Sequence, residues 1–378
     1  MRADRRILGI QIRHQNESCD DVFVLDSPRN AHFPASGLTM VVNSSMEAFS
    51  ASYNAKDVIL YALAIGFGSD PERSEKDLRY LYEEQSDPNF SVVPTFCLAL
   101  TFLEDKGSGF NSSGIPSFPP PLMKSMGVLP RRFLRSEISL DDFPVLHTWQ
   151  SISFHRDVPA PGSGSVKTAL EGQFITVAPK SIGTFVTTEI SVCLPNEFGP
   201  SRALCTMQST ALVLGVSSED VVTFDSGIAK RTKYRPASSS QTVLFEAEYT
   251  VPPSQALLYR LASGDSNKIH VDASLVPMLD SQRPLLHGLC TLGIATRFIL
   301  QWVNDNYKHS HIRHIEARFS KPVFIDDRIS VKVWSVDDTA ECVKQLAFII
   351  RNIETGDILV DKGCAVIDCQ EAIGRSRL

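Results

Sequence analysis

The sequence predicts an α+β protein built from two copies of one unit, each an antiparallel sheet wrapped round a long helix. Three observations lead to this prediction. A short helical motif occurs twice, a second helical candidate follows each copy, and each half then continues as a run of strand-like segments. Helices followed by runs of antiparallel strands are typical of the α+β class.

The repeated motif is Leu-Tyr-x-Leu-Ala-x-Gly, which occurs in residues 57–66 and again in residues 255–264. Its apolar spacing predicts a short helix, and the closing glycine suits the left-handed conformation that often ends helices. A chance likeness is the alternative interpretation. Because the same order of elements follows both copies, we infer that one domain has been duplicated.

The elements that follow the motif differ in kind but keep one order. Helical candidates come first, at Val93–Phe102 and Leu286–Trp302. Strand candidates rich in Val, Ile and Phe come next. They are Trp149–Phe154, Glu171–Val177, Thr184–Cys193 and Ala203–Leu214 in the first half, and Ile315–Phe319, Val323–Ile325, Arg328–Trp334, Lys344–Asn352 and Ile358–Asp368 in the second. This pattern is typical of a hot-dog fold present twice.

The domain boundaries follow from these elements. We expect an N-terminal extension at 1–48, a first repeat at 49–215, a connection at 216–248, a second repeat at 249–370 and a tail at 371–378. A chain of 378 residues with 43% hydrophobic and 21% charged residues is suited to two globular domains.

Charge and hydropathy exclude two classes of partner. The formal net charge of −6 gives no overall attraction to nucleic acid or to anionic lipid. No apolar stretch is long enough to span a membrane, so we expect neither nucleic-acid binding nor a membrane span.

The loop after the second motif carries three polar side chains close together: Asp265, Asn267 and His270. On a regular strand or helix Asp265 and His270 would point in different directions, so they converge only if the chain curves between them. A carboxylate beside an imidazole is suited to general acid–base chemistry. The alternative is ordinary, because Asp and Asn are common in turns and an isolated histidine is usually structural.

A second unusual segment follows at residues 283–293, where a predicted helix starts after Pro284 and contains Gly288 and Gly293. Glycine destabilises helices, so two glycines indicate that another backbone or a ligand approaches closely. Amide groups at the start of this helix would be free to hold a thioester oxygen as negative charge develops on it.

These residues resemble those of a known family. The run from Tyr259 to Asp272, with Gly264-Asp-Ser-Asn-Lys-Ile-His270 inside it, and the run Pro284-Leu-Leu-His287-Gly288 are similar to the MaoC-like (R)-specific enoyl-CoA hydratases. The likeness is to the double hot-dog form of this hydratase 2 family in peroxisomal multifunctional β-oxidation enzymes. In the first half, residues 53–66, 77–83 and 94–96 resemble that family's N-terminal repeat.

The resemblance implies a reaction and a set of residues. The reaction is syn hydration of trans-2-enoyl-CoA to (R)-3-hydroxyacyl-CoA and its reverse, with no metal or redox cofactor, since coenzyme A is part of the substrate. Asp265 and His270 would share the activation of water and the protonation of the α-carbon, and Asn267 would orient the water or the thioester. Gly288, His287 and Glu83 would contact the substrate, although a glutamate on a helix surface is an equally good interpretation of Glu83.

Two departures from the family follow. Lys268 stands where the family usually has proline, which is expected to loosen the loop. The turn after the first motif, Phe67-Gly-Ser-Asp70, contains no histidine, so the resemblance implies that the first repeat is catalytically silent and houses the acyl tail. Alternatives remain a dehydratase acting on a specialised polyketide or acyl-CoA intermediate, and an acyl-binding protein without catalysis.

Two further signals lie outside this site. His309, His311 and His314 have metal-like spacing, but we interpret them as a solvated connection between a helix and a strand. The terminal Ser376-Arg377-Leu378 is similar to the Ser-Lys-Leu signal, so we expect a peroxisomal import receptor as partner and the peroxisome as location. Both a monomer and a homodimer fit a chain that already contains two repeats.

Overall fold

The computed structural model describes residues 49–84, 90–103, 118–120, 128–135, 143–195, 197, 202–230, 232–235, 241–275, 282–340 and 343–372. Within this part the strands form one antiparallel sheet in the order β1-β3-β4-β5-β2-β8-β11-β10-β9-β7, with β6 beside β3. The strands are β1 Phe49–Tyr53, β2 Val145–Phe154, β3 Val166–Lys180, β4 Gly183–Cys193, β5 Cys205–Leu214, β6 Phe224–Asp225, β7 Val243–Thr250, β8 Tyr307–Phe319, β9 Arg328–Ala340, β10 Val343–Asn352 and β11 Ile358–Ala372.

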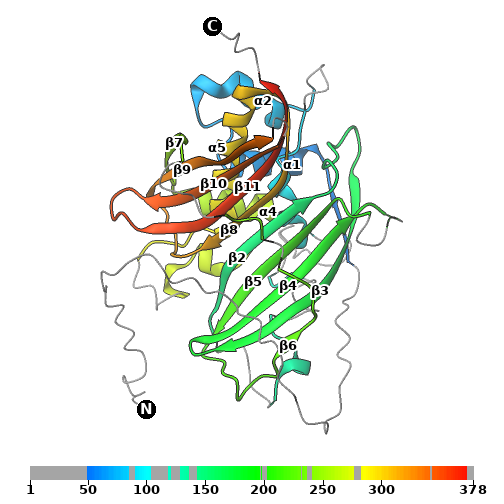
Figure 1. The fold of residues 1–378 in the computed structure, drawn as a ribbon, viewed down its shortest axis with the longest axis vertical. Coiled ribbons are helices and arrows are strands. Elements are labelled where there is room, and N and C mark those ends of the chain that lie inside the picture. The colour runs from blue at the N-terminus through cyan, green and yellow to red at the C-terminus, as the bar shows by residue number, and fades with distance from the viewer. Residues whose placement is uncertain are drawn as a thin grey trace. The chain divides into compact units, whose positions relative to one another are not determined.

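The sheet divides into two halves that match the two predicted repeats. Strands β1 to β5 form one half and β7 to β11 the other, and the halves join where β2 pairs with β8 (Figure 1). The register at this seam places Ile152 opposite Ile315 and Ser153 opposite His314. The two halves therefore form one continuous sheet, which agrees with the predicted double hot-dog fold.

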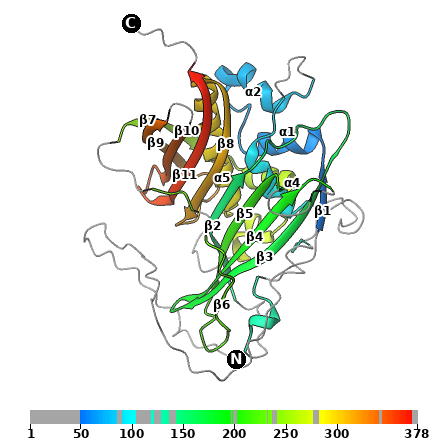
Figure 2. The same cartoon turned by 45° about the vertical axis from the view of Figure 1, so that its right-hand side comes forward.

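The helices lie on one side of this sheet (Figures 1 and 2). They are α1 Ala55–Ala64, α2 Ser74–Leu81, α4 Gln255–Ser263 and α5 Gly288–Asn306, with 3₁₀ turns η1 Pro71–Arg73, η2 Pro94–Thr101, η3 Arg131–Phe133, η5 Lys268–His270 and η6 Ala273–Leu275. The 19-residue α5 packs against β8 and β9, and α1 packs against α4. Helix α5 is therefore the central helix of the second repeat.

The duplication is visible where α1 meets α4. Tyr61 and Tyr259 occupy the same position in the two copies of the motif, and both side chains are buried. Their rings lie 5.9 Å apart between centroids. The two copies of the motif therefore face each other across the boundary between the repeats.

Two predicted elements differ in the structure. The helix expected at Val93–Phe102 is the 3₁₀ segment η2, so this segment does not match α5, and the described residues of the first repeat contain no other helix as long as α5. The segment is apolar on nearly all sides, so the sequence offered no helical face to distinguish the two kinds of helix. The strand expected at Val323–Ile325 is a single bridge between Leu285 and Phe324, because the chain turns at Asp326 with a positive φ of 68°.

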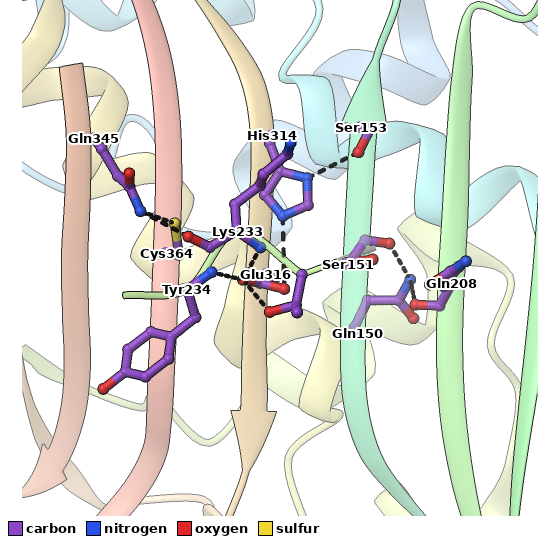
Figure 3. Close-up of polar contacts among 11 residues, drawn as sticks. Gln150, Ser151, Ser153, Gln208, Lys233, Tyr234, His314, Glu316, Gln345 and Cys364 are labelled. Carbon is purple, nitrogen blue, oxygen red and sulfur yellow. Dashed lines mark hydrogen bonds and ion pairs between the residues drawn. The ribbon is translucent and has the colours of Figure 1, made fainter. Parts of the chain in front are cut away.

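Lys233 and Tyr234, in the connection between the repeats, lie beside Glu316 of β8 (Figure 3). There the Glu316 carboxylate accepts hydrogen bonds from the Thr232 hydroxyl at 2.9 Å and the Lys233 amide at 2.7 Å. The Gln345 side chain donates to the Lys233 carbonyl at 2.7 Å. These contacts fasten the connection to β8 and β10, in the half of the sheet that belongs to the second repeat.

The three spaced histidines, interpreted above as a solvated connection, all lie in strand β8, so that prediction is wrong. His314 is buried, and its Nδ1 lies 2.8 Å from the Ser153 hydroxyl (Figure 3). His311 lies 3.0 Å from Asp157. His311 is exposed whereas His314 is buried. Pairing with β11 extends β8 back to Tyr307, which lies before the apolar alternation that starts at Ile312 in the sequence.

Candidate active site

The candidate loop begins where α4 ends. Gly264 closes the helix in the left-handed conformation, with φ 78°, and its amide donates to the Arg260 carbonyl. Only glycine adopts this backbone conformation without steric cost. The chain therefore leaves the helix sharply at Gly264, and Asp265 lies outside the regular helical path.

Asn267 shapes the rest of the loop. Its side-chain oxygen accepts a hydrogen bond from the Ile269 amide at 3.3 Å, which caps the 3₁₀ turn Lys268–His270. Its own amide donates to the Asp265 carboxylate at 3.2 Å. These two bonds curve the chain so that Asp265 and His270 converge, as their spacing requires. The structure therefore gives Asn267 a part in building the loop.

His270 is buried, with 8% of its surface exposed, and its Nδ1 lies 2.9 Å from the Leu285 carbonyl oxygen. A carbonyl only accepts, so Nδ1 carries the proton and donates it. Burial lowers the pKa of His270 to about 4. The ring is therefore neutral at pH 7, and its Nε2 is a hydrogen-bond acceptor with no partner among the described residues.

Asp265 has the opposite shift. Burial raises the pKa of its carboxyl group to about 6, against the smaller lowering effect of the hydrogen bond from the Asn267 amide. A carboxyl group with a pKa near the working pH can both accept and release a proton readily. Asp265 and His270 together thus form a carboxylate and a neutral imidazole, each with unused acceptor capacity.

His287 completes the cluster. Its ring stacks on His270 with centroids 3.6 Å apart and an angle of 25° between the planes. Its Nε2 lies 3.3 Å from the Asp265 carbonyl oxygen, while its buried Nδ1 has no hydrogen-bond partner among the residues that the structure describes. Burial, with His270 beside it, holds the pKa of His287 well below its usual range. The two neutral rings therefore keep each other in place.

Asp265, His270 and His287 offer ligand atoms within 4.8 Å of one another, close enough for a metal ion. A zinc ion lies in the plane of each histidine ring at about 2.0–2.1 Å from nitrogen. Two rings stacked nearly parallel have no common point at that distance. The arrangement therefore fits acid–base chemistry better than metal binding.

The first turn of α5 borders this cluster, since His287 is the residue that precedes the helix. The amide groups of the first helical residues have no partner within a helix. No hydrogen bond from the Gly288 amide occurs within the described part of the chain. A methyl group on Gly288 would meet Phe319 at an ordinary 3.5 Å, so packing alone does not demand glycine there. The Gly288 amide is thus a free donor beside the acid–base pair.

Gly293 explains the second glycine of α5. A Cβ there would lie 2.5 Å from the Ile65 side chain, which belongs to the first repeat. This glycine therefore lets α1 approach α5 closely. The two glycines, which the sequence could not tell apart, differ in purpose: one lies at the site and the other lies between the repeats.

Glu83 is the one predicted site residue that the structure does not bring to this cluster. It is exposed and follows α2, and α2 packs against the end of α5 through contacts such as Lys76 to Asp305. Asp305 lies about 25 Å along α5 from Gly288, at 1.5 Å per residue. The structure thus favours the surface interpretation of Glu83.

Sequence reasoning missed the carbonyl of Leu285 and the side chain of Tyr259. Leu285 fixes the protonation of His270, and the Tyr259 ring lies 5.0 Å from that of His287. A backbone carbonyl leaves no trace in a sequence. Tyr259 belongs to the repeated motif and begins the run that resembles the hydratase family, but neither signal assigned its side chain to the site.

Comparison with known proteins identifies two domains. Residues 236–357 match the family described as "MaoC like domain", and residues 51–129 match the "MFE-2 hydratase 2 N-terminal domain". These matches confirm the resemblance seen in the sequence.

Among the helices of the described part, none combines the length and apolar character needed to cross a bilayer.

Two relatives and one solved structure show the same similarity. The chain is 30% identical to "Peroxisomal multifunctional enzyme type 2" of Drosophila melanogaster, over 75% of this chain and 41% of that enzyme. It is 24% identical to "Probable enoyl-CoA hydratase 2" of Dictyostelium discoideum, over 87% of this chain and 95% of that protein. The crystal structure of a MaoC-like dehydratase from Phytophthora capsici shares the fold, with a TM-score of 0.65 and 22% identity over 88% of this chain and 98% of that one.

Length differs among these relatives. The chain spans 40% of the mouse multifunctional enzyme and 41% of the fly enzyme. The likeness therefore concerns one part of those larger proteins.

Proposed function

We propose that this chain hydrates trans-2-enoyl-CoA to (R)-3-hydroxyacyl-CoA and catalyses the reverse dehydration. Its matches to the MaoC like domain at 236–357 and to the MFE-2 hydratase 2 N-terminal domain at 51–129 are the premise of this proposal. The observation that carries the proposal is the pair of half-buried Asp265, whose pKa is raised to about 6, and buried, neutral His270 next to the first turn of α5. The relatives named above as an enoyl-CoA hydratase 2 and a multifunctional enzyme support the same reaction.

The proposed mechanism starts with a water molecule held between the Asp265 carboxylate and the His270 Nε2. Asp265 accepts a proton from this water while the hydroxide adds to the β-carbon of the enoyl group. The raised pKa of about 6 makes Asp265 a better base than an ordinary carboxylate and allows it to release the proton again. Asp265 then delivers the proton to the α-carbon on the same face, which gives syn addition.

The negative charge that develops on the thioester oxygen needs a donor. The Gly288 amide at the start of α5 supplies one, and the positive end of the helix dipole adds to its effect. The water proton reaches the α-carbon through Asp265 alone, so all atoms balance: one water adds across one double bond. Coenzyme A stays attached throughout, and no other cofactor enters the mechanism.

The experiment that tests this proposal follows the loss of the conjugated enoyl-thioester absorbance with crotonyl-CoA and with a longer enoyl-CoA. We expect hydration by the wild-type protein and a loss of about 10²–10⁴-fold in Asp265→Ala. Failure of the wild type to hydrate any enoyl-CoA contradicts the reaction and favours an acyl-binding protein without catalysis. Unchanged activity in Asp265→Ala contradicts the site.

We further propose that the chain acts in peroxisomes. The fly relative is named peroxisomal, and the terminal Ser376-Arg377-Leu378 is similar to the Ser-Lys-Leu signal read by an import receptor. These three residues lie outside the described part of the structure. Deleting them should redistribute a fluorescent fusion from peroxisomes to the cytosol, and unchanged localisation contradicts the proposal.

A further inference from the structure

The end of α1, in the first repeat, is held by side chains of the second repeat. The Gln255 side-chain amide donates to the Ala64 carbonyl, and the Arg297 guanidinium donates to the Gly66 carbonyl at 2.6 Å. All four of these residues are buried, and Gln255 and Arg297 are only 3% and 2% exposed. Buried contacts of this kind are costly to lose, because each leaves a polar group without a partner.

Tyr249 links these two side chains. Its hydroxyl donates to the Gln255 side-chain oxygen at 2.6 Å, and its ring lies 4.8 Å from the guanidinium carbon of Arg297. We call Tyr249, Gln255 and Arg297 the inter-repeat clasp. A Cβ on Gly66 would lie 3.1 Å from both the guanidinium carbon and the Tyr249 hydroxyl, so this glycine leaves space for the clasp.

The clasp also reaches the first turn of α5. The Gln255 side-chain nitrogen lies 3.8 Å from the Cys290 sulfur, and that sulfur lies 3.7 Å from the Ala64 carbonyl. Cys290 is two residues after Gly288 in the same helical turn. Gln255 therefore touches the end of α1 and the start of α5 at once, while its own helix, α4, leads directly into the loop of Asp265.

We propose that Gln255 is a positioning residue for the reaction: it fixes the first turn of α5, and with it the Gly288 amide, relative to Asp265 and His270. This inference rests on the proposed hydratase function. The first repeat then contributes to catalysis indirectly. Its Ala64 and Gly66 carbonyls accept the hydrogen bonds through which the inter-repeat clasp holds α5 in position. Misplacement of a catalytic group by about 1 Å costs up to about 10²-fold in rate.

Gln301 provides a matched control. It is the same residue type, is also buried, and also joins the repeats, because its side-chain nitrogen donates to Asp77 at 3.1 Å. It lies 13 residues after Gly288, about 20 Å along α5, so it cannot act on the first turn directly. Loss of Gln301 removes an inter-repeat hydrogen bond without touching the start of the helix.

The experiment compares the wild type with Gln255→Leu and Gln301→Leu in enoyl-CoA hydration and in thermal unfolding. We expect both variants to unfold at lower temperature, while only Gln255→Leu loses about ten- to hundredfold in kcat with KM changed by less than about threefold. Tyr249→Phe, which keeps Gln255 but removes the hydroxyl that orients it, should show a smaller loss of kcat and serves if Gln255→Leu does not fold.

Hydrogen exchange gives a readout that does not depend on turnover. The amides of Thr291 to Ile294 should exchange faster in Gln255→Leu than in the wild type, whereas their exchange rates in Gln301→Leu should equal those of the wild type. An unchanged kcat in folded Gln255→Leu, an equal loss in Gln301→Leu, or unchanged exchange at Thr291–Ile294 would each overturn the inference. An inactive wild type would overturn the proposed function instead, and the exchange result would still decide the position of α5.

Discussion

The two turns that follow the repeated motif begin alike and end differently. Both helices end at a left-handed glycine, Gly66 in the first repeat and Gly264 in the second. After Gly66, the Gly68 amide donates to Asp77 and the Ser69 hydroxyl donates to the Gly66 carbonyl. After Gly264, the corresponding chain carries Asp265 and His270.

The two turns differ in whether their polar groups have hydrogen-bond partners. In the first turn, the Gly66 carbonyl and the Ser69 hydroxyl also receive the Arg297 guanidinium, so the polar groups serve the packing of the repeats. In the second turn, the His270 Nε2 remains without a partner in the described part, and Asp265 has one donor from its own loop. The same kind of helix end thus makes a contact between the repeats in the first repeat, and in the second repeat it leaves polar groups available for the proposed chemistry.

A large effect, second only to that of changing Asp265, is expected from removing the imidazole of the second turn. His270→Ala should lower kcat/KM for enoyl-CoA hydration by about 10²-fold, because the water loses the acceptor at Nε2 that positions it. Steady-state kinetics on the purified variant measure this. A loss below about threefold would contradict a part for His270 in the reaction. Circular dichroism checks that the variant is folded.

The dependence of kcat/KM on pH tests the roles of Asp265 and His270 in the second turn. Because the mechanism needs Asp265 ionised, kcat/KM should fall as pH drops through about 6, by about tenfold for each further unit, and stay level above it. His270 adds a second fall only below about 4, where its ring becomes protonated. A profile that rises toward low pH would mean that Asp265 acts as an acid in the free enzyme.

The two glycines of α5 give a comparison within one helix. Gly293→Ala should destabilise the fold by about 1–3 kcal/mol, because its Cβ would lie 2.5 Å from Ile65. Gly288→Ala meets only an ordinary contact with Phe319, so its free energy of unfolding should change by less than about 1 kcal/mol. Equal effects in chemical unfolding would contradict the distinct purposes assigned to these glycines.

The smallest expected effect concerns Lys268, which was expected to loosen the loop. Lys268 is the first residue of the 3₁₀ turn that Asn267 caps, and proline is well tolerated at such a position. Lys268→Pro should therefore stabilise the protein by about 0.4–1 kcal/mol with little change in kcat. Destabilisation on thermal unfolding would show that the Lys268 backbone is not preset for proline.

The sequence predicted the parts of this site that depend on local chemistry. The glycine that ends α4, the convergence of Asp265 with His270 and the start of α5 after Pro284 all follow from residues close together in the chain. Contacts between distant residues could not be predicted in this way. Gln255 and Ala64 are 191 positions apart, and Arg297 and Gly66 are 231 apart, so no periodicity records either contact.

The fold shows the same limit. The alternating segments of the second repeat predicted most of its strands, whereas β7 lies partly inside the expected connection at 216–248. Its residues gain their strand conformation from pairing with β9, which the local pattern does not reveal. His314 was misplaced for a similar reason, because its place in β8 depends on pairing with β11 and with Ser153 on β2 of the other repeat.

The central claim is that one repeat is catalytic and the other is not. Its most direct test is kcat/KM for one trans-2-enoyl-CoA in the wild type, in Asp265→Asn and in Asp70→Asn, which changes the acidic residue of the first turn. The account predicts a loss of about 10²–10⁴-fold for Asp265→Asn and wild-type activity for Asp70→Asn. Equal activity in all three proteins, or a comparable loss in Asp70→Asn, would contradict it.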